Sequence, residues 1–215
     1  MKINTSKILN VILAIALIVV IIKFNPTQQK KDDNKVETKQ EVTKSTLDII
    51  HQRKSVRNFT DQKVSKDQLE TIVKAGMAAP TAVNKQPWAF VAIDDRATLD
   101  KLGDKLPYAK MLKQATSAIV VCGDLNKTLK GWEEIFWVQD CSAATQNILL
   151  AAEAMGLGAV WTAAYPAKDR EKSVIDILNL PKHIIPLCVI PIGYPTGKDK
   201  PKDKWKPENL HWQKW

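Results

Sequence analysis

The sequence predicts an α+β fold in which a central β-sheet is covered by helices. Two short apolar runs, Ala118–Cys122 and Leu187–Ile192, are typical of buried strands. A longer stretch, Trp132–Met155, repeats its apolar residues at helical spacing. Helices and strands alternate along the chain without the even spacing of a doubly wound fold, which favours α+β over a parallel α/β class.

Two helices are expected before the first strand. Residues 47–50 suggest a short helix that leads into a basic segment. Ser65 with Gln68 three residues later forms a capping-box pattern, which opens a second helix that Pro80 ends. Two elements follow in order, a strand at Ala89–Ile93 and a short helix at Ala97–Leu102.

The second half of the domain is organised around the long helix. Its middle, Cys141–Thr145, consists of small residues that permit close approach of another helix, and Gly156 ends it. Two further elements are expected before the last strand, a strand at Ala159–Thr162 and a helix at Lys168–Leu178. After Gly197 the chain ends in a basic, proline-containing tail.

Residues 1–24 are expected to be a hydrophobic membrane anchor or signal segment. Residues 8–22 are almost all apolar, and as a helix they would be about 22 Å long, against a hydrocarbon core of about 30 Å. The absence of an Ala-x-Ala-like site favours an uncleaved anchor, while a cleaved signal stays open. More lysines follow the segment than precede it, which slightly favours the cytoplasmic face, whereas cleavage would mean export. Residues 25–45 form a polar tether, and the domain spans residues 46–215.

The formal net charge of +9 does not by itself indicate a nucleic-acid partner. Residues 1–46 hold eight lysines and four acidic residues, so about half of the surplus lies before the domain. The chain has no G-x-S-x-G or G-x-x-x-x-G-K-[ST] motif, and its three histidines are isolated. Cys122, Cys141 and Cys188 are set in apolar surroundings and are expected to be buried thiols. We therefore expect no metal site and no nucleic-acid binding. The protein is expected either to use a bound cofactor for its chemistry or to bind a ligand without catalysis.

Two polar segments are candidates for a ligand site. Arg53–Arg57 reads Arg-Lys-Ser-Val-Arg, and its two guanidinium groups and hydroxyl suit a phosphate or a phosphorylated polyol. The alternative is a solvated basic stretch. Ala79–Trp88 holds two prolines that fix a loop between a helix and a strand. Trp88, directly after a proline, is more typical of a core anchor than of a ligand platform.

Together these segments resemble the nitroreductase family of flavin enzymes. R-K-S-V-R-x-F is followed by A-P-T-A-x-N-x-Q-P-W, and three later segments also match: G-L-G-A-V-W-T-A-A-Y-P at 156–166, P-I-G-Y-P at 191–195 and P-K-x-K at 201–204. The resemblance covers essentially all of residues 46–215. It implies an α+β homodimer with a central, mostly antiparallel sheet flanked by helices, and with FMN bound at the subunit interface.

The resemblance also implies which residues bind the cofactor. One subunit would hold the FMN phosphate, the ribityl chain and the pyrimidine edge with Arg53, Lys54, Ser55 and Arg57, together with a basic pair at the phosphate, Lys202 and Lys204. The other subunit would approach the same flavin with Pro80, Thr81, Ala82 and Asn84. Lys110 would reach the polar edge of the ring, and the backbone of Ala163 and Ala164 would approach flavin N5. Many relatives carry Glu-Gly at this last pair, which puts the electronic tuning in doubt.

The activity implied by the resemblance is hydride transfer from NAD(P)H through flavin to a nitroaromatic, quinone or similar acceptor, in a ping-pong cycle. Two alternatives stay open: another flavin reaction of the superfamily, such as dehalogenation or flavin fragmentation, and a membrane-tethered flavin- or anion-binding protein without turnover. Trp132, Phe136 and Trp137 either line the cleft or pack at the dimer interface. The segment between Cys122 and Ile135 is short, so the acceptor is not assigned.

Overall fold

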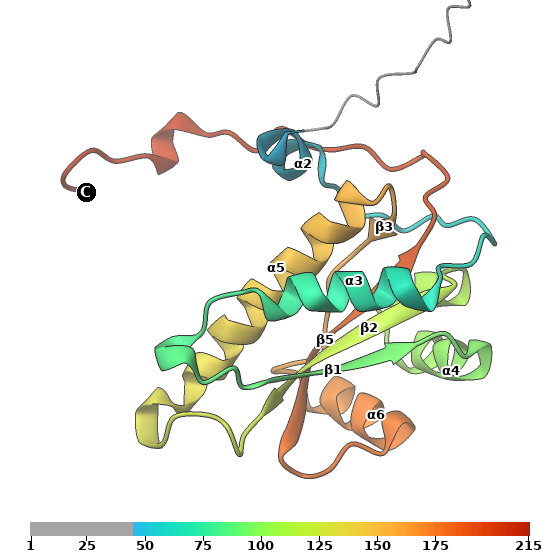
Figure 1. The fold of residues 1–215 in the computed structure, drawn as a ribbon, viewed down its shortest axis with the longest axis horizontal. Coiled ribbons are helices and arrows are strands. Elements are labelled where there is room, and N and C mark those ends of the chain that lie inside the picture. Colours follow the sequence, from blue (N-terminus) through green and yellow to red (C-terminus); the bar gives the residue numbers. More distant parts are fainter. Residues whose placement is uncertain (1–44) are drawn as a thin grey trace, which may run out of the picture. The chain divides into compact units, whose positions relative to one another are not determined.

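A computed structural model describes residues 45–215 of the chain. Its centre is an antiparallel sheet (Figure 1) with the strand order β1-β2-β5-β3, and β4 also pairs with β5. The strands are β1 (Trp88–Ile93), β2 (Ser117–Asp124), β3 (Gly158–Ala159), β4 (Thr162–Ala163) and β5 (Ile184–Gly193). All pairings between these strands are antiparallel, which confirms the sheet type implied by the resemblance.

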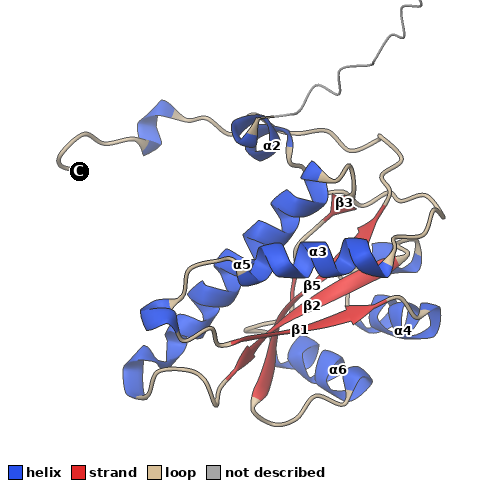
Figure 2. Ribbon diagram, in the orientation of Figure 1, coloured by secondary structure: helices blue, strands red, loops and turns tan. Residues whose placement is uncertain are grey.

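Helices cover both faces of this sheet (Figure 2), which confirms the α+β class. The helices are α2 (Thr46–Gln52), α3 (Lys66–Met77), α4 (Arg96–Lys105), α5 (Phe136–Ala154) and α6 (Lys168–Leu178). Helices α3 and α5 pack on one face, and α4 and α6 pack on the other. The sheet is therefore buried on both sides, and this burial explains why β2 and β5 are continuous apolar runs.

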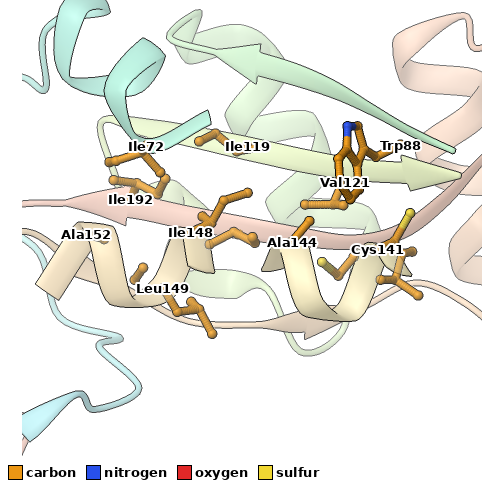
Figure 3. Packing of buried hydrophobic residues seen from close by; sticks show 14 of the residues in the cluster. Ile72, Trp88, Ile119, Val121, Cys141, Ala144, Ile148, Leu149, Ala152 and Ile192 are labelled. Carbon is orange, nitrogen blue, oxygen red and sulfur yellow. The ribbon is translucent and has the colours of Figure 1, made fainter. Parts of the chain in front are cut away.

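Alternate residues of β2 divide the core into two clusters. Ile119 and Val121 pack with α3 and α5 (Figure 3), while Ala118 and Val120 pack with α4 and α6. This division follows from the two-residue period of a strand, which sends successive side chains to opposite faces. The cysteines Cys122, Cys141 and Cys188 are free and buried in this core, as expected.

The capping box expected at Ser65 is present, and the helix that it opens ends at Met77, before Pro80. The long helix is shorter than expected, because Gly131–Ile135 forms a 3₁₀ turn and α5 begins at Phe136.

The prediction of a single strand at Ala159–Thr162 is wrong. The structure instead has two short strands, β3 and β4, which pair with different parts of β5. Ala159 lies opposite Ile192, whereas Thr162 lies opposite Val189. The residues between them leave the ladder, which breaks the strand in two.

The predicted membrane segment and most of the predicted tether lie outside the described residues. Within residues 45–215, no helix combines the length and the apolar character that crossing a membrane requires.

Candidate cofactor site

A basic cavity of about 560 Å³ lies where α2 meets the C-terminal tail. It brings together three of the cationic residues that the resemblance assigns to the phosphate, namely Arg53, Lys202 and Lys204. Arg53 caps the C-terminus of α2, and its backbone N–H donates to the Ile49 carbonyl. Residues almost 150 positions apart in the sequence thus line one cavity with the donors that an oxyanion requires.

The segment that follows Arg53 is held in an extended conformation beside β3. Ser55 forms a parallel bridge with Ala159, and the Val56 N–H donates to the Ala159 carbonyl at 3.0 Å. Val56 is completely buried, while Arg57 is exposed. Because successive side chains of an extended segment point to opposite sides, Lys54 and Val56 point inward and Ser55 and Arg57 point outward.

The same segment is tied to the tail by a carboxylate. Asp199 Oδ2 accepts the backbone N–H groups of Arg57 and Asn58, at 3.1 and 3.3 Å. Asp199 lies three residues before Lys202, so these bonds fix the tail next to the Arg53–Arg57 segment. The contacts between the Asp199 carboxylate and the backbone of this segment therefore bring Lys202 and Lys204 of the tail to the cavity.

Lys54 does not line the basic cavity. Its Nζ donates to both carboxylate oxygens of Glu153 on α5, at 3.1 and 3.0 Å. Both side chains are largely buried, with exposed fractions of 20% for Lys54 and 8% for Glu153. The structure thus separates Lys54 from the other predicted phosphate residues and places it in an ion pair with the helix.

The loop that contains Pro80, Thr81, Ala82 and Asn84 lies at the other end of α5. Pro80, Thr81 and Ala82 line a cavity of about 340 Å³ together with side chains of α5. The Ala82 N–H donates to Asp140 Oδ1 at 2.9 Å, and Gln86 Nε2 donates to Asn84 Oδ1 at 2.8 Å. The first bond holds the loop against the first turns of the helix, and the second closes the loop on itself.

This loop has an unusual backbone. Val83, Asn84 and Gln86 have φ values of 42°, 56° and 49°. Positive φ is rare for residues other than glycine and is a true outlier for a β-branched residue such as Val83. Strained backbone of this kind persists where the surrounding structure fixes it, and it is concentrated at ligand sites.

Within one chain, these two regions are far apart. Lys54 contacts Glu153 and Ala82 contacts Asp140, and 13 residues of α-helix span about 20 Å. The structure therefore does not bring Pro80–Asn84 to Arg53 in a single subunit (Figure 1). A site that uses both regions needs a second copy of the chain.

The remaining predicted residues lie near the first region. Lys110 is exposed, and its Nζ donates to the Asp104 carbonyl at 3.0 Å. The next residue, Met111, packs against the cluster of Val56 and Phe59. Ala163 is exposed on β4, but the Ala164 N–H is used within the sheet, where it donates to the Leu187 carbonyl at 3.0 Å. Of this pair, Ala163 is thus the exposed residue.

The three aromatic residues before and within α5 differ in environment. Trp137 is buried, lies edge-on to Tyr165 at 4.9 Å and occupies the space above Gly123, so it packs in the core. Trp132 is 78% exposed and contacts Phe136 edge-on at 5.7 Å. It lines a cavity of about 440 Å³ that also contains Tyr165 and Lys168.

Sequence reasoning missed three acidic residues that organise these regions: Asp140, Glu153 and Asp199. One feature could have revealed the first two. Each is a carboxylate flanked by buried apolar residues of α5, and a buried carboxylate needs a partner.

Comparisons with known proteins show what this chain is similar to. The model of the family described as "Nitroreductase family" matches residues 50–107 and 104–194. A protein of Methanothermobacter thermautotrophicus, whose name gives NADH dehydrogenase/NAD(P)H nitroreductase as a provisional activity, is 42% identical over 170 residues, or 79% of this chain and 87% of its own length. Among solved structures, a protein of Bacteroides thetaiotaomicron with the same provisional name is 49% identical and has a TM-score of 0.75, with 80% of this chain and 99% of that chain covered. A provisionally named nitroreductase of Desulfovibrio desulfuricans, solved in complex with FMN, is 29% identical with a TM-score of 0.69, and the match covers 80% and 98% of the two chains. This chain therefore belongs to the nitroreductase family.

Proposed function

We propose that this protein is an FMN-dependent oxidoreductase that passes hydride from NAD(P)H to a nitroaromatic, quinone or similar acceptor. The observation that carries the proposal is the basic cavity of Arg53, Lys202 and Lys204, which forms at the point where the family motif meets the tail. The names of the relatives, which include NAD(P)H nitroreductases and FMN reductases, support the activity.

The residues of the cavity fit the chemistry of FMN. A phosphate monoester carries nearly two negative charges at neutral pH, and Arg and Lys side chains are its usual partners. Ser55 and Arg57 lie next to the cavity, on the outward side of the segment, where they would reach the ribityl chain and the pyrimidine edge. Lys110 would reach the same edge from the neighbouring segment.

The site is completed by a second copy of the chain. Pro80, Thr81, Ala82 and Asn84 of one subunit would meet Arg53 of the other if two α5 helices paired antiparallel across a two-fold axis. One side of α5 is free for such pairing: at helical spacing it presents residues that are exposed or only partly buried, namely Gln139, Ala143, Gln146, Leu150 and Ala154. The tail adds four exposed large apolar side chains that a partner subunit would cover, those of Trp205, Leu210, Trp212 and Trp215.

When bound, FMN supplies the hydride-accepting and hydride-donating atom, N5, and the protein supplies position and electrostatics. Ala163, which is exposed on β4, would face this atom with its backbone. The cavity beside it, lined by Trp132, Tyr165 and Lys168, offers flat aromatic walls to a planar acceptor. The cations at Arg53 and Lys202 would anchor the cofactor at its far end and so fix its orientation.

We also propose that residues 8–22 attach the domain to a membrane through the polar tether. The apolar run in the sequence supports this attachment. The need for NAD(P)H favours the cytoplasmic face.

The proposal is tested by anaerobic visible spectra of the full-length protein, purified in mild detergent and titrated with stoichiometric NADH or, in a parallel sample, NADPH, and then with a quinone. We expect flavin absorption that bleaches with the nicotinamide and recovers with the quinone. Bound flavin that responds to neither nicotinamide would contradict NAD(P)H oxidation and support another flavin reaction or an exported domain. A protein that does not bind FMN even when it is supplied would support the binding-protein alternative.

A further inference from the structure

Two carboxylates of α5 lie where the helix meets the two loops that carry the proposed cofactor-binding residues. Glu153, near the C-terminal end, accepts two bonds from Lys54 Nζ at 3.1 and 3.0 Å. Asp140, in the second turn, accepts the Ala82 N–H at 2.9 Å. Both carboxylates are buried, so neither contact is an incidental surface pair.

The Lys54–Glu153 pair has the properties of a structural anchor. The segment around Lys54 is extended, so its side chain points inward on the same side as buried Val56, away from the outward-pointing Ser55 and Arg57. A buried ion pair fixes geometry well because removal of one partner leaves the other charge uncompensated in a poorly solvated place. The ammonium group of Lys54 is thus directed at the helix, while Arg53 lines the basic cavity.

Asp140 contacts a backbone group and not a charged side chain, but it also fixes the position of a loop. It binds a backbone N–H at the start of the strained stretch, one residue before Val83. A hydrogen bond donated to a buried carboxylate restricts the position of that peptide group, which would otherwise relax toward an ordinary conformation.

We propose that Glu153 and Asp140 are positioning residues, which hold the two halves of the cofactor site at a fixed separation along α5, and that Lys54 acts through Glu153 and does not bind the cofactor. This inference rests on the proposed function. Because α5 also presents the surface for pairing with a second copy, one rigid helix sets both the spacing of the half-sites within a subunit and their match across the dimer.

A charge exchange separates positioning by Lys54 from direct binding. In Lys54→Glu or Glu153→Gln, we expect the Kd for FMN, measured by quenching of flavin fluorescence on titration into the apoprotein, to rise about tenfold or more. In the double variant Lys54→Glu with Glu153→Lys, the pair re-forms with reversed charges, and we expect the Kd to return to within about threefold of the parent. A folded double variant that binds FMN no better than Lys54→Glu would overturn the proposal, because it would mean that the Lys54 charge acts on the phosphate itself.

If the exchanged pair does not fold, as judged by circular dichroism, the neutral pair Lys54→Met with Glu153→Leu asks the same question. Apolar residues of similar volume often replace a buried ion pair without loss of stability. Retention of FMN supports a positioning role for Lys54, whereas its loss from the folded variant contradicts it.

The Asp140 contact is tested by a conservative and a non-conservative change. Asp140→Asn keeps an oxygen that can accept the Ala82 N–H, and we expect a nearly unchanged Kd for FMN. Asp140→Ala removes the acceptor, and we expect an increase of about tenfold. Equal Kd values for the two variants, whether both parental or both weakened, would overturn the positioning role.

A matched control and a flavin-free measurement distinguish this proposal from the proposed function. Lys168 and Glu171 of α6 also pair at 3.0 Å with a buried glutamate, although this lysine is 82% exposed, and Glu171→Gln should leave the Kd for FMN unchanged. In the apoprotein, Glu153→Gln should speed hydrogen exchange of the Val56 amide, which donates to Ala159, while Glu171→Gln should not. If the parent does not bind FMN, the proposed function fails, but unchanged exchange at Val56 is what overturns positioning by Glu153.

Discussion

The two ends of α5 present the same helix to very different loops. At the C-terminal end, the loop is extended, its backbone is paired with β3, and its outward side chains include the cations Arg53 and Arg57. At the N-terminal end, Asp140 of the helix is the one charged side chain among the described residues that line the cavity. Three residues of the loop have positive φ. Charge selects the ligand at one end, and backbone shape fits it at the other. A binding site for a molecule with a phosphate tail and a flat ring needs both, and in this protein they lie about 20 Å apart along one helix.

The largest effect is expected when two subunits, each damaged in a different half of the cofactor site, are combined in one dimer. Arg53→Ala with Arg57→Ala removes two guanidinium groups, each worth about 1.5–3 kcal/mol in charge-assisted bonds, so FMN affinity should fall about 10²–10⁴-fold while the protein stays folded. Ala82→Trp should block the other half-site. Neither homodimer should hold flavin, but the heterodimer of the two, isolated with different affinity tags, contains one intact site.

We therefore expect one FMN per heterodimer, measured by absorbance at the flavin band against protein concentration. A single subunit cannot explain this result, because each carries a defect. Full flavin occupancy in the Arg53→Ala with Arg57→Ala homodimer would contradict the phosphate assignment. A folded heterodimer without flavin would show that the two ends of α5 do not meet across the dimer.

A smaller effect is expected from a charge on the exposed side of α5. Ala154 is exposed in the single chain, so Ala154→Arg should barely change the stability of a monomer. Antiparallel pairing of two α5 helices would place the new side chain in the interface, where arginine is much larger than alanine and its charge would be desolvated, so we expect the dimer Kd to rise about 100-fold, with loss of flavin. Sedimentation velocity measures the change. Ala97→Arg, at an exposed position of α4 on the opposite face of the sheet, is the matched control and should remain dimeric.

The third change tests how firmly the extended Arg53–Arg57 segment, at the C-terminal end of α5, is held in place by its contacts. A Cβ atom at Gly158 would lie 2.6 Å from Val56 Cγ1, so Gly158→Ala must push Val56 and the residues on either side of it. Overpacking of this kind costs about 1–3 kcal/mol of unfolding free energy, and we expect FMN affinity to fall about tenfold. Urea unfolding and FMN titration measure the two effects.

Gly103→Ala provides the control for this change. Its Cβ would lie 3.2 Å from Cγ of the flexible Lys113 side chain and at ordinary contact distance, 3.4 Å, from Leu112 Cβ, in a helix where alanine is favoured over glycine by up to about 1 kcal/mol. It should leave FMN affinity unchanged. If Gly158→Ala lowers stability but leaves FMN affinity at the parental value, the position of the Val56 segment does not control the site.

The same comparison shows what could be predicted from the sequence. Strands β2 and β5 and the cap at Ser65 were predictable because an apolar run and a capping box are local patterns. The role of Lys54 was not, because a motif gives the order of residues but not which side chain of an extended segment points inward. The break between β3 and β4 depends on their separate pairing with β5, which no short segment reveals.

The smallest effect concerns the centre of the sheet on which α5 packs, where β2 and β5 are closed to water. Burial raises the pKa of the Cys122 thiol from its ordinary value of 9.0 to about 12, and it raises the pKa of Cys188 to about 12 as well. A thiol whose pKa is raised on folding contributes its full share of stability below pH 9, and this share is lost as the pH rises toward 12, because only the unfolded chain releases the proton. For one such thiol, the loss between pH 8 and pH 10 is about 1.4 kcal/mol of unfolding free energy. Cys122→Ala should lower stability at every pH but should also reduce the drop between pH 8 and pH 10 by that amount, as measured by urea unfolding. An equal drop in both proteins would mean that the thiol ionises in the folded state, and hence that the centre of the sheet is open to water.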